Sequence, residues 1–412
     1  MSEFLELLPP IEALARLMMH LPAAQVRAEI IPTITGLGRV LAAPVLANEP
    51  LPPFDRSTVD GYAVHAADTY GASESLPVYL PLTDEVPMGA APGFELPRGA
   101  AAAIFTGGML PAGADAVVML EHTQTARPGE LEVLRAVAEG ENILKTGEDV
   151  ASGQEVLPGG TLLRPAEIGG LTALGLMEIE VAQRPKIGII SSGDEVVPPG
   201  QTPQPGQVRD VNSYSLSALV EQAGGMPVRY GIVPDRSEAL EAALQKGMQK
   251  CDALVITAGS SASTRDLTAA VVNRLGQPGV LVHGVNVRPG KPTILAVCNG
   301  KPVIGLPGNP VSALVIARIF VVPVITHLLG RVTGLRQPRV QATLAVNVAS
   351  QAGREDYLPV TLKDTPSGIF ADPIFYKSNL IFTLARADGL LHIPADATGM
   401  AAGTQVEIEL LI

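Results

Sequence analysis

A proline-locked turn between two apolar stretches carries residue types that suit an anion site. Residues 302–312, PVIGLPGNPVS, run from a short apolar strand into a long apolar helix. Pro307 and Pro310 fix the backbone, Gly308 lets the main chain approach a ligand, and Asn309 and Ser312 can cap or donate at the helix start. The free N–H groups and the dipole of such a helix start favour negative charge.

Two further loops share this design. Ser191-Ser192-Gly193-Asp194-Glu195 follows an expected strand at 186–190, and the loop 258–266, AGSSASTRD, follows an expected strand at 253–257. Glycine and serine expose N–H groups to phosphate, while the acidic residues of these loops can hold a divalent cation that neutralises it. The alternative is that each loop is an ordinary strand-to-helix turn with capping Ser and Asp side chains.

The turn Arg288-Pro289-Gly290-Lys291-Pro292 places two cations on a stiff backbone at the end of a strand. This pattern favours a phosphate or oxyanion clamp, and the alternative is a solvated turn.

The elements around these loops alternate between strand and helix from about residue 185 to 330. The expected strands are 186–190, 228–233, 253–257, 280–287, 293–297 and 302–306, and the expected helices are 213–222, 237–248 and 266–275. Asn299-Gly300 predicts a hairpin between the last two strands. This pattern is typical of a largely parallel α/β sheet, with all three loops on one edge.

The helix expected at 311–329 is apolar and long enough to span a membrane, but it contains Arg318, Pro323 and His327. We therefore expect a buried helix.

The remaining chain predicts three further units. Residues 1–50 read as helical, with apolar residues at helical spacing from Ile11 to Met18 and a short turn at 39–43. We expect them to pack with a helical stretch, 165–174, as one discontinuous domain made of 1–50 and 141–184. Residues 51–140 form a β-rich module, the α/β domain spans 185–333, and 334–412 form a small, barrel-like β domain.

Composition excludes some classes of protein. The formal charge is −12 and no local cluster of Lys and Arg reverses it, which argues against a nucleic-acid surface. Two cysteines are too few for a disulfide framework or a Cys-rich metal site. With no basic leader or signal peptide visible, we expect a cytoplasmic protein without a membrane partner.

Several motifs, taken together and in order, carry a resemblance to a known family. They are DRSTVDGYAV (55–64), IFTGGMLPAGADAVVMLE (104–121), GED (147–149), SSGDEV (191–196), residues 252–268 and GLPGNPVSA (305–313). The chain resembles the molybdopterin molybdenumtransferases, the family that includes the gephyrin and plant Cnx E domains.

The resemblance implies an elongated four-domain protomer that forms a homodimer. In it, the α/β domain of one subunit faces the β-rich module of the other. The implied reaction of molybdenum cofactor biosynthesis inserts molybdenum from molybdate into adenylylated molybdopterin, with Mg²⁺-dependent release of AMP. A molybdopterin adenylyltransferase and downstream molybdoenzymes are the implied partners.

By this resemblance, Asp60 and Thr106 act from the β-rich module and Asp149 supports the site. The other implied roles are Mg²⁺ binding by Glu195, Asp235 and Asp266; phosphate contact by Gly259, Ser260, Ser261 and Ser263; oxyanion contact by Arg288 and Lys291; and a ligand-facing turn at Pro307, Gly308, Asn309, Pro310 and Ser312. In each case the alternative is a carboxylate that only caps a helix.

The chain departs from the family pattern at two places. Ala258 to Ser263 replaces a more glycine-rich loop, and Gly284 stands where many members have a lysine. Tungstate insertion, a non-catalytic molybdopterin carrier and an adenylyltransferase relative therefore stay open as alternatives.

Overall fold

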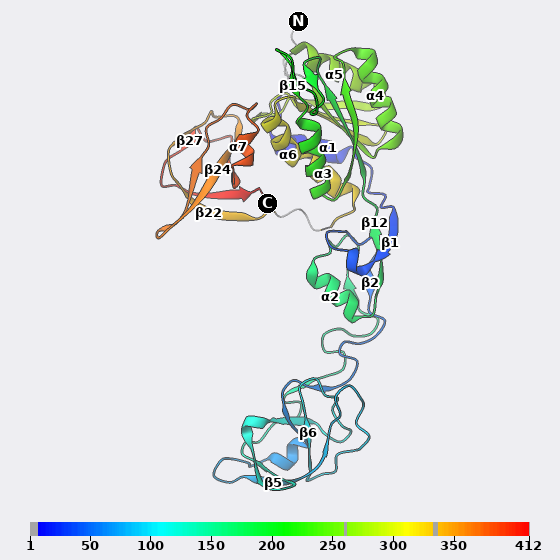
Figure 1. Ribbon diagram of the computed structural model, residues 1–412, viewed down its shortest axis with the longest axis vertical. Coiled ribbons are helices and arrows are strands. Elements are labelled where there is room, and N and C mark those ends of the chain that lie inside the picture. Colours follow the sequence, from blue (N-terminus) through cyan, green and yellow to red (C-terminus); the bar gives the residue numbers. More distant parts are fainter. Residues whose placement is uncertain (1–6, 259–261, 333–336, 412) are drawn as a thin grey trace.

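The molecule is elongated and bent, with its parts arranged along one path (Figure 1). The computed structural model describes residues 7–258, 262–332 and 337–411. An α/β domain and a β-barrel lie side by side at one end, a small domain follows, and a β-rich module forms the far end. The chain passes through the small domain twice, once on the way to the β-rich module and once on the way back.

The α/β domain contains a six-stranded sheet in the order β16-β13-β17-β21-β20-β18. The first four strands run parallel and the last two antiparallel, which confirms the predicted sheet. Asn299 and Gly300 both have positive φ in the β20–β21 hairpin, as the sequence predicts. The strands are β13 (Lys186–Ser192), β16 (Met226–Val233), β17 (Ala253–Ala258), β18 (Pro278–His283), β20 (Ile294–Cys298) and β21 (Lys301–Pro307).

Helices cover both faces of this sheet. On one face, α3 (Asn212–Gln222) and α6 (Pro310–Leu328) pack in one core with strand residues such as Ile187 and Val255. On the other face, α4 (Ser237–Lys250) and α5 (Ala262–Leu275) pack with Ile190 and Ile256. The alternation of strand residues between the two cores follows from the two-residue period of a strand.

Helix α6 is apolar around most of its circumference because it lies in the protein interior. Phe320 and Ile316 are fully buried. Within the described ranges, α6 is the one helix that is long and apolar enough to cross a membrane, and 61% of its most apolar window is buried in the protein. The expectation of a buried helix is confirmed.

The first helix belongs to a different core from the one we expected. Ala13 and Leu17 of α1 (Pro10–Met19) are buried in the core of the α/β domain, not against residues 165–174. An apolar stripe shows that a helix buries one face, but it does not say against which domain. Residues 39–43 do not form the expected turn either, because Val40 and Leu41 pair in extended form with Leu162 and Val181.

The small domain is discontinuous, as expected. Strand β1 (Ala28–Pro32) pairs with β12 (Glu178–Ala182), and β2 (Val45–Leu46) pairs with β11 (Glu155–Leu157). Helix α2 (Pro165–Ala173) and the short helix η1 (Thr33–Thr35) complete it. Its core holds Leu41, Leu163, Leu171, Ile179 and Val181.

The β-rich module contains a second six-stranded sheet, in the order β7-β4-β6-β5-β9-β8. A Cβ atom at Gly61 would lie 2.0 Å from the carbonyl oxygen of Val118, so this close approach of β4 to β7 requires glycine. The strands are β4 (Gly61–Val64), β5 (Val78–Glu85), β6 (Ala101–Ile104), β7 (Ala116–Met119), β8 (Thr123–Arg127) and β9 (Glu130–Val133); β3 (Arg56–Ser57) pairs with β10 (Ile143–Leu144), and η2 (Ala66–Thr69) and η3 (Leu120–His122) are short helices.

The C-terminal domain is a closed five-stranded barrel. Strands β24, β25, β22, β28 and β26 pair in that order, and a β24–β26 pairing closes the ring. Strand β19 (Val287–Arg288), from the α/β part of the chain, adds to the barrel beside β24. The barrel strands are β22 (Arg339–Leu344), β24 (Glu355–Thr365), β25 (Gly368–Pro373), β26 (Gly389–Ile393) and β28 (Gln405–Leu410); β23 (Val348–Ala349), β27 (Gly399–Met400) and α7 (Phe382–Ala385) lie in its connections.

Candidate active site

The loops after β13, β17 and β21 lie at one edge of the α/β sheet. These strands are parallel neighbours, with Ile190 opposite Ile256 and Ala258 opposite Pro307. Because parallel neighbours end at the same edge, the predicted meeting of the loops is confirmed. Gly259, Ser260 and Ser261 lie outside the described residues, and the side chain of Ser263 in α5 does too.

The turn after β21 faces the barrel. Pro310 is the first residue of α6, and Ser312 is buried. Asn309 does not cap the helix as we expected: its Nδ2 donates to Ser378 Oγ at 2.9 Å. The barrel loop therefore draws this amide away from its own helix, and the turn becomes one side of a contact between two domains.

A cavity of about 780 Å³ lies between the α/β domain and the barrel. Five of the predicted binding residues line it from the α/β side: Arg288, Lys291, Pro307, Asn309 and Ser312. The barrel supplies residues that sequence analysis missed, among them Arg354, Asp356, Tyr357, Phe375, Tyr376, Lys377 and Ser378. The cavity thus combines a predicted wall with an unpredicted one.

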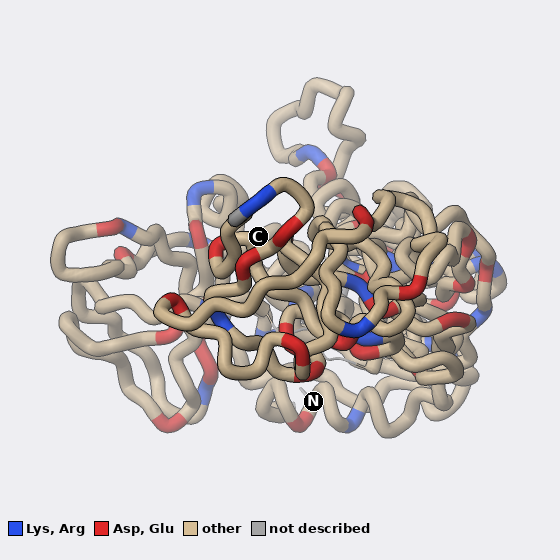
Figure 2. Tube along the Cα trace, turned by 90° about the horizontal axis from the view of Figure 1, so that it is seen from below, with Lys and Arg blue, Asp and Glu red and all other residues tan. Residues whose placement is uncertain are grey.

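Four basic residues surround this cavity. Arg288 and Lys291 come from the α/β side, and Arg354 and Lys377 come from the barrel. Figure 2 shows basic and acidic residues interspersed along the chain, so the cavity gathers cations within an acidic protein. Guanidinium and ammonium groups around a polar cavity favour an oxyanion.

Two tyrosines add further donors to the cavity. Burial raises the pKa of the Tyr376 hydroxyl and of the Tyr357 hydroxyl, so both stay protonated at neutral pH. The hydroxyl of Tyr376 donates to the backbone oxygen of Tyr357 at 3.5 Å. A protonated phenol does not repel an anion, and the cavity keeps its cationic character.

Carboxylates organise the neighbouring end of the sheet. Buried Asp210 accepts from Ser191 Oγ at 3.0 Å and from Ser213 Oγ at 2.6 Å, which ties the loop after β13 to the start of α3. Asp235, after β16, accepts from Ser192 Oγ at 2.5 Å. Sequence analysis missed Asp210 because it follows only a two-residue strand, β15 (Val208–Arg209), which pairs with β14 (Val196–Val197).

The predicted Mg²⁺ ligands do not form a ready metal site. Across residues 7–258, 262–332 and 337–411, no group of three or more His, Cys, Asp or Glu side chains lies close enough to hold a metal ion. Glu195 and Asp235 follow the neighbouring strands β13 and β16, whereas Asp266 lies on α5. Because β17, which precedes α5, is two strands from β16, a gap of about 10 Å separates their ends.

Comparison with known proteins covers nearly the whole chain. Residues 8–175 match a family model described as "MoeA N-terminal region (domain I and II)", residues 188–327 match "Probable molybdopterin binding domain", and residues 341–411 match "MoeA C-terminal region (domain IV)". The chain is 35% identical over 382 residues to Molybdopterin molybdenumtransferase 2 of Mycobacterium tuberculosis, covering 92% of this chain and 94% of the relative. It is 31% identical over 407 residues to the molybdopterin molybdenumtransferase of Bacillus subtilis, covering 98% and 94%.

The chain belongs to the molybdopterin molybdenumtransferase family.

The same family appears among solved structures. A molybdopterin biosynthesis MoeA protein from Pyrococcus horikoshii OT3 superposes with a TM-score of 0.86 at 34% identity, covering 98% of this chain and 100% of that one. Membership makes the protein a transferase of molybdenum cofactor biosynthesis. It also confirms the multidomain α/β and β fold that the motifs implied.

Two residues that the family motifs imply for catalysis are in contact. The backbone N–H and the Oγ1 of Thr106 both donate to Asp60 Oδ1, each at 2.8 Å. These bonds lower the pKa of the Asp60 carboxyl, the backbone bond most. Both residues lie in the β-rich module, and the third implied residue, Asp149, is exposed.

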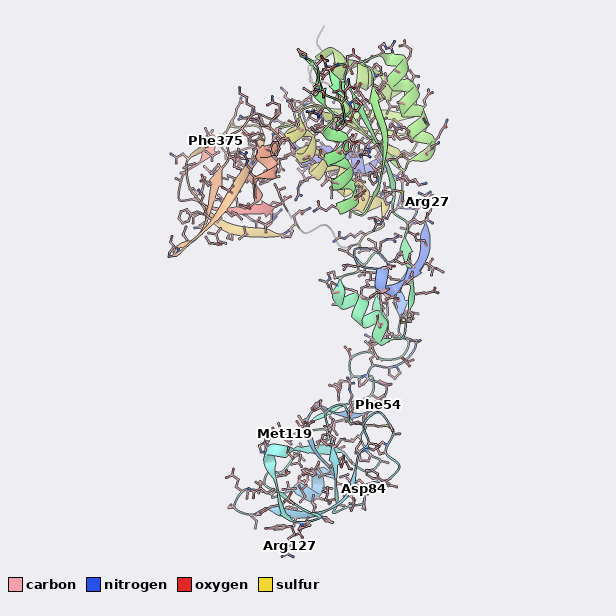
Figure 3. The ribbon with its side chains drawn as sticks, viewed as in Figure 1. Arg27, Phe54, Asp84, Met119, Arg127 and Phe375 are labelled. Carbon is pink, nitrogen blue, oxygen red and sulfur yellow. The ribbon has the colours of Figure 1, made fainter. Side chains whose placement is uncertain are left out.

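The molybdopterin molybdenumtransferase motifs therefore lie at two distant places in one chain. Figure 3 labels Phe375, which lines the cavity, on the barrel, and Asp84 and Arg127 in the β-rich module at the opposite end. The contact of Asp60 with Thr106 belongs to that module and cannot line the cavity of its own protomer (Figure 1).

The lysine that many family members have at position 284 is replaced by a glycine with φ +104°. Its N–H donates to the carbonyl oxygen of Thr293 at 2.8 Å. A side chain at this φ would strain the backbone, so the loss of the cation goes with a local backbone change. Arg354 and Lys377 bring two cations to the same cavity from the barrel.

Proposed function

We propose that the protein inserts molybdenum from molybdate into adenylylated molybdopterin and releases AMP with the help of Mg²⁺. The observation that carries this proposal is the cavity whose four cations come in pairs from two domains. Molybdate is a tetrahedral dianion, and arginine and lysine donors arranged around it supply both charge and directed hydrogen bonds.

The cavity and the loops at the sheet edge divide the substrate between them. Arg288 and Lys291 contact the oxyanion, while the start of α5 and the loop before it receive the phosphate of the pterin. The pterin dithiolene supplies the sulfur ligands of molybdenum, so the protein needs no cysteine at the site. Both cysteines, Cys251 and Cys298, are buried.

Mg²⁺ fits this site only together with substrate. Magnesium keeps several waters and commonly takes one or two carboxylates plus phosphate oxygens. Glu195 and Asp235 follow neighbouring strands and would supply those carboxylates, with Asp266 organising the phosphate side. Bound there, the cation would neutralise charge on the leaving AMP.

We also propose a homodimer in which each active site combines two subunits. Asp60 and Thr106 then reach the α/β loops from the partner's β-rich module, which they cannot do within one chain. The small domain supports this arrangement because it exposes the apolar side chains of Ile30, Ile34, Leu37, Leu46 and Met177, a surface that a second copy would cover.

The reaction places the protein between two others in a cytoplasmic sequence. An adenylyltransferase must prepare the adenylylated substrate, and molybdoenzymes must take up the product. Tungstate has the same charge and shape as molybdate, so competition between the two oxyanions in the assay measures the preference.

The test is an incubation of the purified protein with adenylylated molybdopterin, Mg²⁺ and molybdate. We expect AMP release, and we expect a product that activates an apo-molybdoenzyme. Omission of Mg²⁺ should stop AMP release. Binding of molybdate and pterin without AMP release or active cofactor would instead identify a carrier and overturn the proposal.

A further inference from the structure

The joint between the α/β domain and the barrel sets an acid directly across from a cavity arginine. Strand β19 pairs in parallel with β24, and this register places Arg288 opposite Asp356. Next to this pair, the backbone N–H of Glu355 donates to the carbonyl oxygen of Asn286 at 3.1 Å. The joint is therefore built from main-chain pairing, and it fixes where the Asp356 carboxylate lies.

Asp356 holds two arginines that come from different domains. Arg354 Nε donates to Asp356 Oδ1 at 2.7 Å, and Arg354 Nη2 donates to Oδ2 at 3.2 Å. Arg288 Nη1 lies 3.7 Å from Oδ2. The Asp356 side chain is only 8% exposed, and it is the one acidic residue among the described residues that line the cavity.

We propose that Asp356 is a positioning residue that holds the guanidinium groups of Arg288 and Arg354 in the orientation in which they receive the oxyanion. The inference rests on the proposed function of the cavity. Arginine has a planar fork of five donors, and the two-point contact with Asp356 occupies Nε and Nη2 of Arg354. A free arginine must lose side-chain freedom when it binds a ligand, whereas a held one has already lost it on folding.

Charge alone predicts the opposite behaviour for this residue. A carboxylate beside an anion site repels the anion, so removal of Asp356 raises the positive charge of the cavity and should tighten oxyanion binding. Loss of positioning should weaken it. The direction of the change in affinity therefore separates the two roles.

The experiment measures the affinity of the full-length protein for molybdate by isothermal titration calorimetry. We expect Asp356→Asn to weaken binding about tenfold, the order expected when ordering two long side chains shifts from folding to binding. In turnover, KM for molybdate should rise while kcat changes little. Asp356→Glu should recover part of the affinity because it restores a carboxylate.

Glu355→Gln is the matched control. It removes the same charge one residue away, but Glu355 contacts His392 at 2.8 Å and does not line the cavity. Its molybdate affinity should stay within about twofold of wild type, since it touches neither arginine. Equal weakening in both variants would mean that general charge or stability causes the effect, and would overturn the inference.

Other outcomes are equally decisive. Unchanged or tighter binding by Asp356→Asn overturns the positioning role. If that variant does not fold, Arg354→Lys carries the test, because lysine keeps the charge without the two-point contact, and unchanged affinity there overturns the inference too. Lys291→Ala separates the two levels: if it binds molybdate as well as wild type, the proposed oxyanion site itself fails.

Discussion

At the scale of single residues, the contact between Asp60 and Thr106 is the feature of the β-rich module closest to chemistry. One carboxylate oxygen of Asp60 accepts both donors of Thr106. Each bond favours the ionised carboxylate, so Asp60 is charged at any pH near neutrality. An exposed and fixed negative charge is suited to act on a substrate held by another domain.

Replacement of this carboxylate tests its part in the reaction. We expect Asp60→Asn to lower the rate of AMP release about a hundredfold, the size typical of a lost catalytic group. Molybdate affinity should not change, because residues of the α/β domain and the barrel line the cavity. Asp84→Asn, an exposed acid of the same module, is the control and should release AMP at the wild-type rate. A loss of molybdate binding in Asp60→Asn would contradict this division.

The pKa of Asp60 provides a second check at this scale. Because its pKa is lowered in the folded protein, the contact is fully present above the ordinary pKa of aspartate and is lost as pH falls through the folded value. Thr106→Val removes the side-chain donor and keeps the backbone donor. We expect the pKa of Asp60 to rise part of the way toward its ordinary value, measured by NMR titration of the carboxyl carbon. An unchanged pKa would mean that the hydroxyl does not donate to Asp60.

At the scale of elements, the turn from Arg288 to Pro292 decides how two cations face the cavity. Gly290 in this turn has φ +114°, and a Cβ atom there would lie 2.2 Å from Cγ1 of Ile316 in α6. The turn is thus pressed against the core helix of the α/β domain. Glycine is required for the backbone conformation and for the close approach.

This packing predicts the effect of a single methyl group. Gly290→Ala should destabilise the protein by about 2 to 4 kcal/mol, from the left-handed backbone and from overpacking against Ile316. It should also weaken molybdate binding, because the turn carries Arg288 and Lys291. Gly129→Ala is the matched control: Gly129 has φ +80° with nothing within 4 Å of an added Cβ. Calorimetric unfolding compares the two, and equal losses would argue against the contact with Ile316.

The start of α2 contains an acid that stabilises the small domain. Glu167 Oε2 accepts the backbone N–H of Arg164 at 2.9 Å, and its carboxylate also pairs with the Arg164 side chain. These contacts lower the pKa of Glu167 from 4.5 to about 2, mainly through the side-chain bonds from Arg164. A lowered pKa means that the stabilisation is complete above pH 4.5 and fades as pH falls toward 2.

Glu167→Gln should therefore lower stability by about 1 kcal/mol at neutral pH, the usual size of a helix cap. The difference between variant and wild type should shrink as pH falls below 4.5. Hydrogen exchange of the α2 amides at several pH values measures this locally. A difference that is constant with pH would show that charge on Glu167 does not contribute.

At the scale of the whole molecule, the shape separates the residues that the proposed reaction brings together. The cavity and the sheet loops lie at one end, and Asp60 with Thr106 lies at the other (Figure 1). Two copies are the simplest way to join them, because a symmetric dimer makes the same junction twice.

A mixture of inactive subunits tests this junction. Co-expression of Asp60→Asn with Lys291→Ala should yield mixed dimers with one intact site each. With random pairing, about half the dimers are mixed, so activity should reach about a quarter of wild type, although each variant alone is nearly inactive. Activity in the mixture no higher than in the separate variants would contradict a site shared between subunits.

The sequence by itself determined the α/β alternation, the hairpin at Asn299-Gly300 and the shared edge of the three loops. These features depend on local patterns: the period of apolar residues, the turn residues, and the rule that parallel strands end together. The turn with Arg288 and Lys291 was recognisable for the same reason, since its two cations and two prolines are adjacent in the chain.

Only the tertiary structure decided what faces that turn. Asn309 and Ser378 meet across 69 residues, and Arg354, Asp356 and Lys377 reach the cavity from barrel loops with no recognisable motif. The partner of helix α1 was likewise decided by packing and not by its apolar stripe. Local patterns specify elements and their exposed faces, but the surfaces that meet depend on how whole domains pack and on which strand edges pair, here β19 with β24.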